Sequence, residues 1–301
     1  MNGPTFYVRA LNETIDGYTQ MTSKIGFCRR RTATEFWPAC IAQLIQVELL
    51  RRRQSLAKIQ GASLAYSQCL KSFVYGFFTL SAFLFVLRAE AKTDDLQARI
   101  QLRREYESRC REDSDIHEHI PVLYSLAKQC SSVVEIGLRF MNSTWGILQG
   151  LADSSSDART YLGIDLAYPP LNILHLAKKL AKENGIAFYF LKSNDMSIDL
   201  APADLLFIDS LHTYCHLTYE LETFSPQIRK FIAMHDTSYP WGTADDIEYT
   251  GNYSEYPIEY DRTKSGLWAA VEDFLERHPE WKLRERRFNN YGFTILERVE
   301  R

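Results

Sequence analysis

The chain has 301 residues, of which 46% are hydrophobic and 24% are charged, and these values exclude an intrinsically disordered protein. The net charge of −3 conceals an asymmetry, because residues 1–110 carry 16 Lys and Arg against 9 Asp and Glu, whereas residues 111–301 carry 19 against 29. Six cysteines without a C-x-x-C pair exclude a zinc site of standard spacing and favour reduced thiols. We therefore expect two parts, a helical extension over residues 1–110 and a larger domain over residues 111–301.

The predicted extension contains two helix-like segments and one strongly apolar segment. Apolar positions recur with helical spacing over Glu35–Lys58, and the composition of Ala89–Arg111 is typical of an exposed helix. Between them, Ser72–Leu87 has no charged residue, but its sixteen residues would span about 24 Å, less than the ~30 Å core of a bilayer. Residues 72–88 are thus predicted either to associate with a membrane or to form a buried or self-associating helix. The protein is expected to be cytoplasmic or membrane-associated.

The second part alternates apolar runs of strand length with amphipathic helices, which is typical of a doubly wound α/β sheet. Asp115, with Glu118 three residues later, resembles a capping box and predicts the start of a helix through Ile120 and Leu123. The parallel strands predicted after it are Val133–Ile136, Tyr161–Ile164, Ala187–Leu191, Leu205–Ile208 and Phe231–Met234. The helices predicted between them are Ser143–Leu151, Leu171–Glu183 and Tyr214–Ile228.

The end of the chain departs from a purely parallel sheet. A polar, tyrosine-rich insert, Ala244–Lys264, precedes a predicted helix over Leu267–Arg277. Two strand-like runs follow, Trp281–Phe288 and Gly292–Leu296, and the residues between them have turn chemistry. The sequence therefore predicts that an antiparallel hairpin completes the sheet, an arrangement that points away from a plain dehydrogenase fold.

Carboxylate and imidazole side chains follow the fourth and fifth predicted strands. Asp209 and His212 come after the fourth strand, and His235 and Asp236 come directly after the fifth. Because ligands of parallel α/β sheets bind at the carboxyl ends of strands, we expect these side chains to meet in one crevice. As an alternative, His212 hydrogen-bonds the helix that follows it and His235 only supports its neighbours.

Each of the first three predicted strands also ends in an acidic residue. Glu135 lies in VVEIGLR, where Gly137 lets the backbone approach a ligand closely, and Asp165 follows 30 residues later in YLGID. Asp195 follows the third strand in KSND. A carboxylate at position 165 can accept hydrogen bonds from both hydroxyls of a nucleoside ribose. One such residue is often only a helix N-cap, but three in succession favour a cofactor that contains a nucleoside.

These motifs resemble those of class I S-adenosylmethionine (SAM)-dependent methyltransferases. Longer segments, among them SDIHEHIPVLYSLAKQCSSVVEIGLR, DLLFIDSLHTY and IRKFIAMHDT, are similar to an uncharacterised branch related to macrocin O-methyltransferases and cephalosporin-hydroxylase-like proteins. The similarity covers Tyr106–Arg298 and implies a Rossmann-like sheet of the methyltransferase type. It also implies SAM as cofactor. The methionine part of SAM would be contacted by Glu135, Gly137, Arg139 and Ser143. The ribose would be contacted by Asp165 and the adenine by Asp195.

The resemblance further implies a divalent metal ion, which metal-dependent relatives bind through acidic residues after the fourth and fifth strands. Asp209 and Asp236 match those positions, whereas His235 stands where a carboxylate is common. Imidazole favours softer ions than Mg²⁺, so both Mg²⁺ and Mn²⁺ are candidates. The expected metal ligands are Asp209, His235 and Asp236. A metal ion on Asp209 would lower the pKa of an acceptor hydroxyl, and His212 or His235 would take its proton.

The predicted function is SAM-dependent O-methylation of a glycan or small molecule, assisted by the metal ion. The tyrosines of the Ala244–Lys264 insert, Tyr249, Tyr253, Tyr256 and Tyr260, are expected to cover the acceptor. The sequence shows no basic face interleaved with aromatic residues, so nucleic-acid binding is not expected. One alternative is a non-catalytic Rossmann-like protein whose extension binds a membrane or a partner. The other is metal-assisted hydroxylation or hydrolysis in the same crevice.

Overall fold

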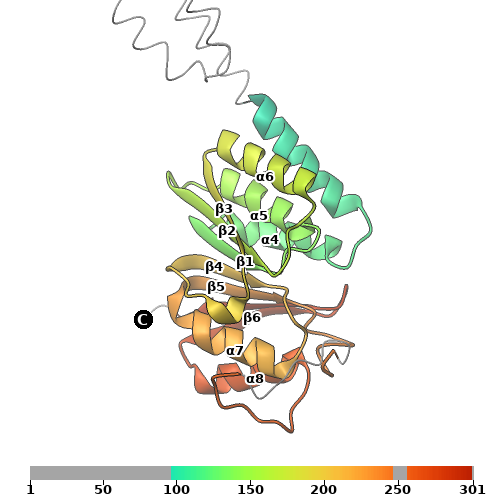
Figure 1. The fold of residues 1–301 in the computed structure, drawn as a ribbon, viewed down its shortest axis with the longest axis vertical. Coiled ribbons are helices and arrows are strands. Elements are labelled where there is room, and N and C mark those ends of the chain that lie inside the picture. The colour runs from blue at the N-terminus through green and yellow to red at the C-terminus, as the bar shows by residue number, and fades with distance from the viewer. Residues whose placement is uncertain (1–95, 247–255, 300–301) are drawn as a thin grey trace, which may run out of the picture. The chain divides into compact units, whose positions relative to one another are not determined.

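The computed structural model describes residues 96–246 and 256–299, which all belong to one unit, Leu84–Arg301. These residues form a seven-stranded sheet in the order β3-β2-β1-β4-β5-β7-β6 (Figure 1). The strands are β1 (Ser132–Ile136), β2 (Arg159–Asp165), β3 (Ile186–Lys192), β4 (Ala203–Ile208), β5 (Ile228–His235), β6 (Trp281–Arg287) and β7 (Phe293–Arg298). The structure thus confirms the predicted α/β, doubly wound Rossmann-like sheet of the methyltransferase type with its terminal hairpin.

The first five strands are parallel, and the chain changes direction across the sheet between β1 and β4. β1 pairs with β2 on one side and with β4 on the other. All six residues of β4, ADLLFI, are buried, because a central parallel strand is covered on both faces. Ligands of open α/β sheets bind outside the carboxyl ends of the strands at such a switch point. The fold therefore places a binding crevice beside the ends of β1 and β4.

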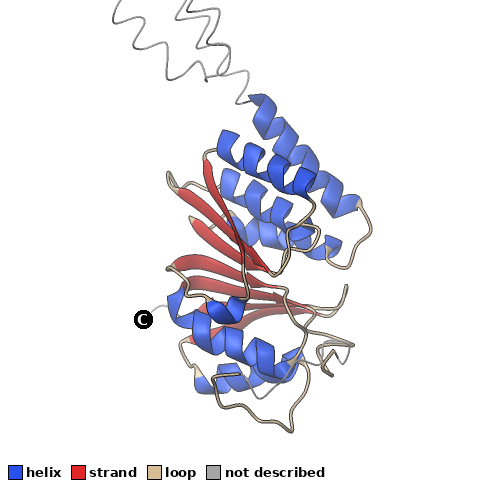
Figure 2. Ribbon diagram, in the orientation of Figure 1, coloured by secondary structure: helices blue, strands red, loops and turns tan. Residues whose placement is uncertain are grey.

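Helices cover both faces of the sheet (Figure 2). One layer contains α4 (Ile120–Ala127), α5 (Asn142–Ala152) and α6 (Leu171–Glu183), and the other contains α7 (Tyr214–Phe224) and α8 (Leu267–Arg277). Short 3₁₀ helices are η1 (His117–His119), η2 (Asp195–Ser197) and η3 (Ser225–Gln227). The bounds of α6 and α8 match the predicted helices, whereas α7 ends before the predicted Ile228. Pro226 lies in η3, and a proline has no N–H to donate to a carbonyl of the preceding helical turn.

The hairpin turn lies at the same edge as the carboxyl end of β5. β7 pairs antiparallel with β5, and Phe293 lies opposite His235. Three consecutive residues of the turn, Asn290, Tyr291 and Gly292, have positive φ values of 50°, 63° and 97°. A Cβ on Gly292 would lie within 2.6 Å of Ser238, so only glycine allows this close approach. The turn therefore packs against the segment that follows β5.

The predicted capping box at Asp115 is wrong. Neither η1 nor α4 has a side-chain hydrogen bond at its N-cap, and α4 instead has Pro121 in its first turn. A proline suits the first turn because its φ is already helical and its missing N–H would have no partner there. The carboxylate of Asp115 accepts a hydrogen bond from Arg139 Nη1 at 2.7 Å.

Part of the predicted extension lies within the described residues. Residues 96–111 are helical, and Leu102 is fully buried in the same core cluster as residues of α4 and α5, although this helix was predicted to be exposed. The predicted helix over Glu35–Lys58 and the apolar segment 72–88 fall outside the described residues. Within the described part of the chain, no helix combines the length and the hydropathy needed to cross a bilayer.

Candidate active site

Asp209, His212, His235 and Asp236 lie together at the carboxyl ends of β4 and β5. His212 Nε2 is 2.8 Å from Asp236 Oδ2, and His235 Nδ1 is 3.3 Å from both Asp209 Oδ1 and Asp236 Oδ2. β4 and β5 are parallel and in register over their last residues, so the segments that follow them are neighbours. The structure thus brings together the four side chains that were expected to share a crevice.

The turn after β1 contacts this cluster directly. Gly137 has a φ of +83°, and a Cβ at this position would lie 1.9 Å from the backbone oxygen of Asp209. The backbone N–H of Asp209 donates to the carbonyl of Ile136 at 2.8 Å. Arg139 and Met141 also have positive φ values, 44° and 62°, which cost a residue with a side chain about 1–2 kcal/mol each. Such strain is typical of functional sites, and here it shapes the loop that faces the switch point.

Charge pairing fixes the protonation of the two imidazoles. Burial alone would lower the pKa of His212, but hydrogen bonds to Asp209 and Asp236 and their charges raise that pKa to about 9. Burial also opposes the charge of His235, yet Asp209 and Asp236 raise the pKa of His235 well above its usual value. The pKa of Asp209 is lowered by the charge of His235 despite burial. At neutral pH, two protonated imidazoles therefore face the carboxyl groups.

The same side chains offer donor atoms for a divalent ion. Asp209, His212 and Asp236 each present a ligand atom, and these atoms lie within 4.8 Å of one another. Asp236 Oδ1 is buried without a hydrogen-bond partner, and a bound cation would satisfy it. His235 Nε2 lies 3.0 Å from the carbonyl of Asn290, to which it can only donate, so Nδ1 faces the carboxylates and would become a ligand atom once an ion displaced its proton. The donor set therefore fits a divalent ion, with His212 as well as the predicted His235 within reach.

Glu135 and Ser143, two of the predicted cofactor residues, lie on either side of the turn after β1 and are hydrogen-bonded to each other. Both are buried, and Glu135 accepts hydrogen bonds from the hydroxyls of Ser143, Thr144 and Tyr161. Burial raises the pKa of Glu135 to about 7, although these hydrogen bonds act in the opposite direction. The Glu135 carboxyl group therefore connects the start of α5 to β1 by hydrogen bonds.

This buried carboxyl group predicts a fall in stability with rising pH. The folded protein keeps a proton on Glu135 up to pH about 7, whereas an unfolded chain releases it near its usual value of 4.5. The unfolded state therefore binds fewer protons between these values, so the free energy of unfolding should decrease as pH rises through this window. In Glu135→Gln this component should be absent. Urea unfolding of both proteins from pH 4.5 to 8 measures it, and parallel curves would contradict the assignment.

Asp165 fastens the turn after β1 to the end of β2. Its carboxylate accepts hydrogen bonds from the backbone N–H groups of Leu138 at 2.8 Å, Arg139 at 3.0 Å and Ala167 at 2.8 Å. A carboxylate has roughly four acceptor positions, so Asp165 retains capacity for a further donor. The Arg139 side chain extends outward to Asp115. Asp165 is thus the predicted cofactor residue with a partly exposed carboxylate next to the glycine turn.

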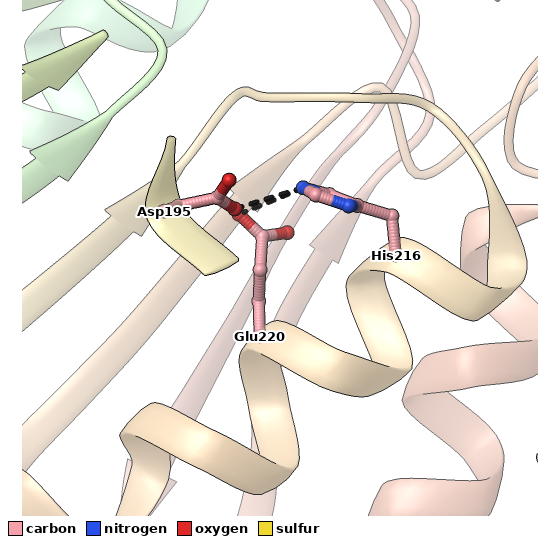
Figure 3. Close-up of side chains that lie close together, drawn as sticks. All are labelled: Asp195, His216 and Glu220. Atoms are coloured by element: carbon pink, nitrogen blue, oxygen red, sulfur yellow. Dashed lines mark ion pairs between the residues drawn. The ribbon is translucent and has the colours of Figure 1, made fainter. Parts of the chain in front are cut away.

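Asp195 belongs to a second, separate cluster, shown in Figure 3. Its Oδ2 is 2.8 Å from His216 Nε2 on α7, and Glu220 Oε1, one helical turn further, is 3.8 Å from the same nitrogen. All three residues are buried. His216 and Glu220 were not among the residues predicted from the sequence. Their four-residue spacing was the available signal, because it places both side chains on one face of a helix.

Aromatic rings connect the first cluster to a surface depression. The ring of Trp241 lies 4.7 Å from that of His212 and 5.3 Å from that of Tyr291. The depression has a volume of about 560 Å³ and is lined by Asp113, Ser114, Asp115, Tyr239, Asn290 and Tyr291. Tyr239, which lines the depression, is 81% exposed. Tyr256 is hydrogen-bonded to His216, and Tyr249 and Tyr253 lie outside the described residues.

No protein-family model and no curated protein matches the chain. Among solved structures, an O-methyltransferase from Bacillus cereus in complex with SAH is 14% identical, with 67% of this chain and 91% of that chain covered and a TM-score of 0.43. The O-methyltransferase TomG from Streptomyces achromogenes, in complex with SAM, is 14% identical, with 68% and 90% covered and a TM-score of 0.39. A Corynebacterium glutamicum protein is 19% identical, with 68% and 91% covered and a TM-score of 0.44. Values this low do not assign an activity to the chain.

Proposed function

We propose that this protein is a SAM-dependent O-methyltransferase that acts on a hydroxyl group of a glycan or small molecule. The observation that carries the proposal is the contact between the Gly137 turn and Asp209 at the switch point of the sheet. This contact joins a loop suited to a nucleoside cofactor to a cluster suited to proton removal. The resemblance of the sequence motifs to class I methyltransferases, and to the macrocin-related branch, supports the same reading.

The cofactor half of the proposed site is formed by the loops after β1, β2 and β3. Asp165 has remaining acceptor capacity for a ribose hydroxyl, while its bonds to the Leu138 and Arg139 amides hold the loop in shape. The hydrogen bond between Glu135 and Ser143 connects the two ends of that loop. The contact between Asp195 and His216 joins η2 to α7, and we place the adenine end of SAM beside η2. These residues bind and orient the cofactor, which supplies the methyl group.

The acceptor half of the proposed site is formed by the segments after β4 and β5. The carboxylates of Asp209 and Asp236 would hold a divalent ion, which would supply Lewis acidity toward the acceptor oxygen. His212 is 21% exposed and is the imidazole closer to solvent, whereas His235 is 1% exposed. His212 carries its proton while it faces Asp236, so it can act as a base only when the negative charge beside it is reduced. We assign proton removal to His212 and orientation of the two carboxylates to His235.

The rings around the depression support an acceptor that stacks. Trp241 and Tyr291 lead from His212 to the depression, and Tyr239 projects beside it. Sugars and flat aromatic molecules both stack on such rings. Both substrates would then meet at one edge of the sheet, where the sulfonium methyl group and the acceptor oxygen can align.

Calorimetry with SAM tests the proposed function. We expect the full chain to bind SAM and Asp165→Ala to bind it at least about tenfold more weakly, because a lost hydrogen bond to a charged group costs about 1.5–3 kcal/mol. Asp199→Ala is the matched control, since Asp199 is exposed after η2. Absence of SAM binding, with or without Mg²⁺ or Mn²⁺, would remove the methyltransferase proposal. Equal affinity of Asp165→Ala and the unaltered chain would reject only the assignment of the ribose site.

A further inference from the structure

The cluster of Asp195, His216 and Glu220 is chemically unusual because its two carboxyl groups are buried beside each other. Asp195 is 7% exposed and Glu220 is 0% exposed. Figure 3 shows the Asp195 and Glu220 carboxyl groups directed toward each other, with the His216 ring beside them. His216 and Glu220 come from one face of α7, and Asp195 comes from η2, which follows a different strand. Three ligand atoms, one from each residue, lie within 4.8 Å of one another.

One carboxylate oxygen of this cluster has no partner at all. Glu220 Oε2 is buried and has no hydrogen-bond partner, while Glu220 Oε1 accepts from the hydroxyl of Ser210 at 2.7 Å. Carboxylate oxygens only accept, so two facing carboxylates cannot satisfy each other. His216 Nε2 lies 2.8 Å from Asp195 Oδ2, but the Glu220 carboxyl group still needs a cation, or a proton shared with Asp195, because unpaired buried charges are strongly disfavoured.

We propose that Asp195, His216 and Glu220 bind one divalent transition-metal ion, and that this site shares no ligand with the candidate active site. The ion would join η2 to α7 and so fix the loop that follows β3. Because the ion would lie among buried side chains, its role is structural and it takes no part in methyl transfer. The inference stands on the geometry of these three residues and needs no cofactor.

The surroundings of His216 favour a metal ion over a shared proton. His216 Nδ1 is 2.9 Å from the hydroxyl of Tyr256. If Nδ1 donates its proton to that oxygen, Nε2 carries the lone pair and points at the carboxylates, as in most metal-binding histidines. One imidazole nitrogen and two carboxylate oxygens suit Zn²⁺, Mn²⁺ or Fe²⁺, whereas Mg²⁺ and Ca²⁺ prefer oxygen ligands alone. We therefore expect Zn²⁺ and its spectroscopic substitute Co²⁺ to bind.

Zn²⁺ binding to the full chain, without SAM, tests the proposal. After chelator treatment, Zn²⁺ affinity and stoichiometry are measured by competition with a chromogenic chelator. Glu220→Gln should lose one bound ion, with a fall in affinity of more than about 100-fold, because even a group that only supports a ligand contributes 10–100-fold. The amide of this variant can still accept from Ser210 and can donate to Asp195, so the metal-free fold is retained. Glu222→Gln, which alters a partly exposed residue paired with Arg277, is the control on the same helix.

Asp209→Asn separates this site from the candidate active site. We expect the Zn²⁺ ion lost in Glu220→Gln to remain bound in Asp209→Asn, and the visible absorption of bound Co²⁺ to change in His216→Asn. Tyr256→Phe, which removes one hydroxyl, gives a second measurement, with an expected loss of 10–100-fold. Identical Zn²⁺ stoichiometry and affinity in Glu220→Gln and the unaltered chain would overturn the proposal and leave the shared proton. Loss of the same ion in Asp209→Asn would also overturn it.

Discussion

Asp236→Asn is expected to reduce kcat/KM for methyl transfer by about 10²- to 10⁴-fold, the range lost when acid–base catalysis fails, and to leave SAM binding unchanged. The variant removes the charge that pairs with His212 at 2.8 Å and one proposed ligand of the divalent ion. Asp236 has a φ of +57°, a conformation that asparagine adopts more readily than other residues with a side chain. The backbone of the site should therefore keep its shape, and the loss should be chemical rather than structural.

The same variant should change how His212 titrates. Hydrogen bonds to Asp209 and Asp236 raise the pKa of His212 to about 9 against the effect of burial, so removal of the Asp236 charge should bring this pKa down. In the unaltered protein the raised pKa stabilises the folded state fully below pH 6.5, and this stabilisation is lost as pH rises through about 9. In Asp236→Asn the loss should begin at lower pH. An NMR titration of His212 and urea unfolding at several pH values measure both effects.

Asp199→Asn is the matched control, because it removes the charge of an exposed aspartate away from this cluster. It should change neither kcat/KM nor the pKa of His212. If Asp236→Asn retained activity within about twofold of the unaltered protein, then Asp236 would have no part in proton removal or metal binding. If activity fell but the pKa of His212 stayed the same, the ion pair between His212 and Asp236 would not explain the loss of activity.

The positions of strands and helices were largely predictable because local patterns determine them. The bounds of α6 follow from apolar residues at helical spacing, of which Leu174, Ala177, Leu180 and Ala181 are buried. β4 was recognisable because its last four residues, Leu205–Ile208, are all apolar, as expected of a central parallel strand. The end of α7 was misplaced although Pro226 stood in the sequence, because the apolar positions Phe224 and Ile228 continued the helical spacing past it.

The candidate site was predictable where each residue directly follows a strand. Asp209 and Asp236 meet because the carboxyl ends of β4 and β5 lie side by side, a consequence of parallel topology alone. The partners of Asp195 were not predictable in this way. His216 reaches it from α7, and the contact depends on how that helix packs against η2, for which the sequence pattern carries no direct signal.

The wrong capping box has a similar origin. Asp115 and Glu118 have the residue types and spacing of the motif, and an isolated peptide could use them so. In the folded protein Arg139, more than twenty positions later in the chain, lies beside Asp115 and donates to it, and Pro121 starts the helix instead. A contact distant in sequence has replaced a local one. The carboxylate thereby joins the loop after β1 to the segment before α4.

Gly137→Ala is expected to lower the free energy of unfolding by about 2–5 kcal/mol and to abolish SAM binding. Alanine at a φ of +83° costs about 1–2 kcal/mol, and its Cβ would lie 1.9 Å from the carbonyl oxygen and 2.5 Å from the carbonyl carbon of Asp209. Both contacts are with backbone, so no side chain can turn aside. Either the loop after β1 or the end of β4 must move, and each movement separates the two halves of the proposed site.

Gly185→Ala distinguishes the contact with Asp209 from backbone strain. Gly185 has a similar φ of +71°, but a Cβ there would meet only the end of the flexible Arg159 side chain, at 3.1 Å. This control should therefore cost only the conformational ~1–2 kcal/mol and should leave SAM binding intact. Urea unfolding and calorimetry of both variants make the comparison. Equal losses of stability would mean that the Gly137 turn and Asp209 do not constrain each other, and the joint site at the switch point would lose its main support.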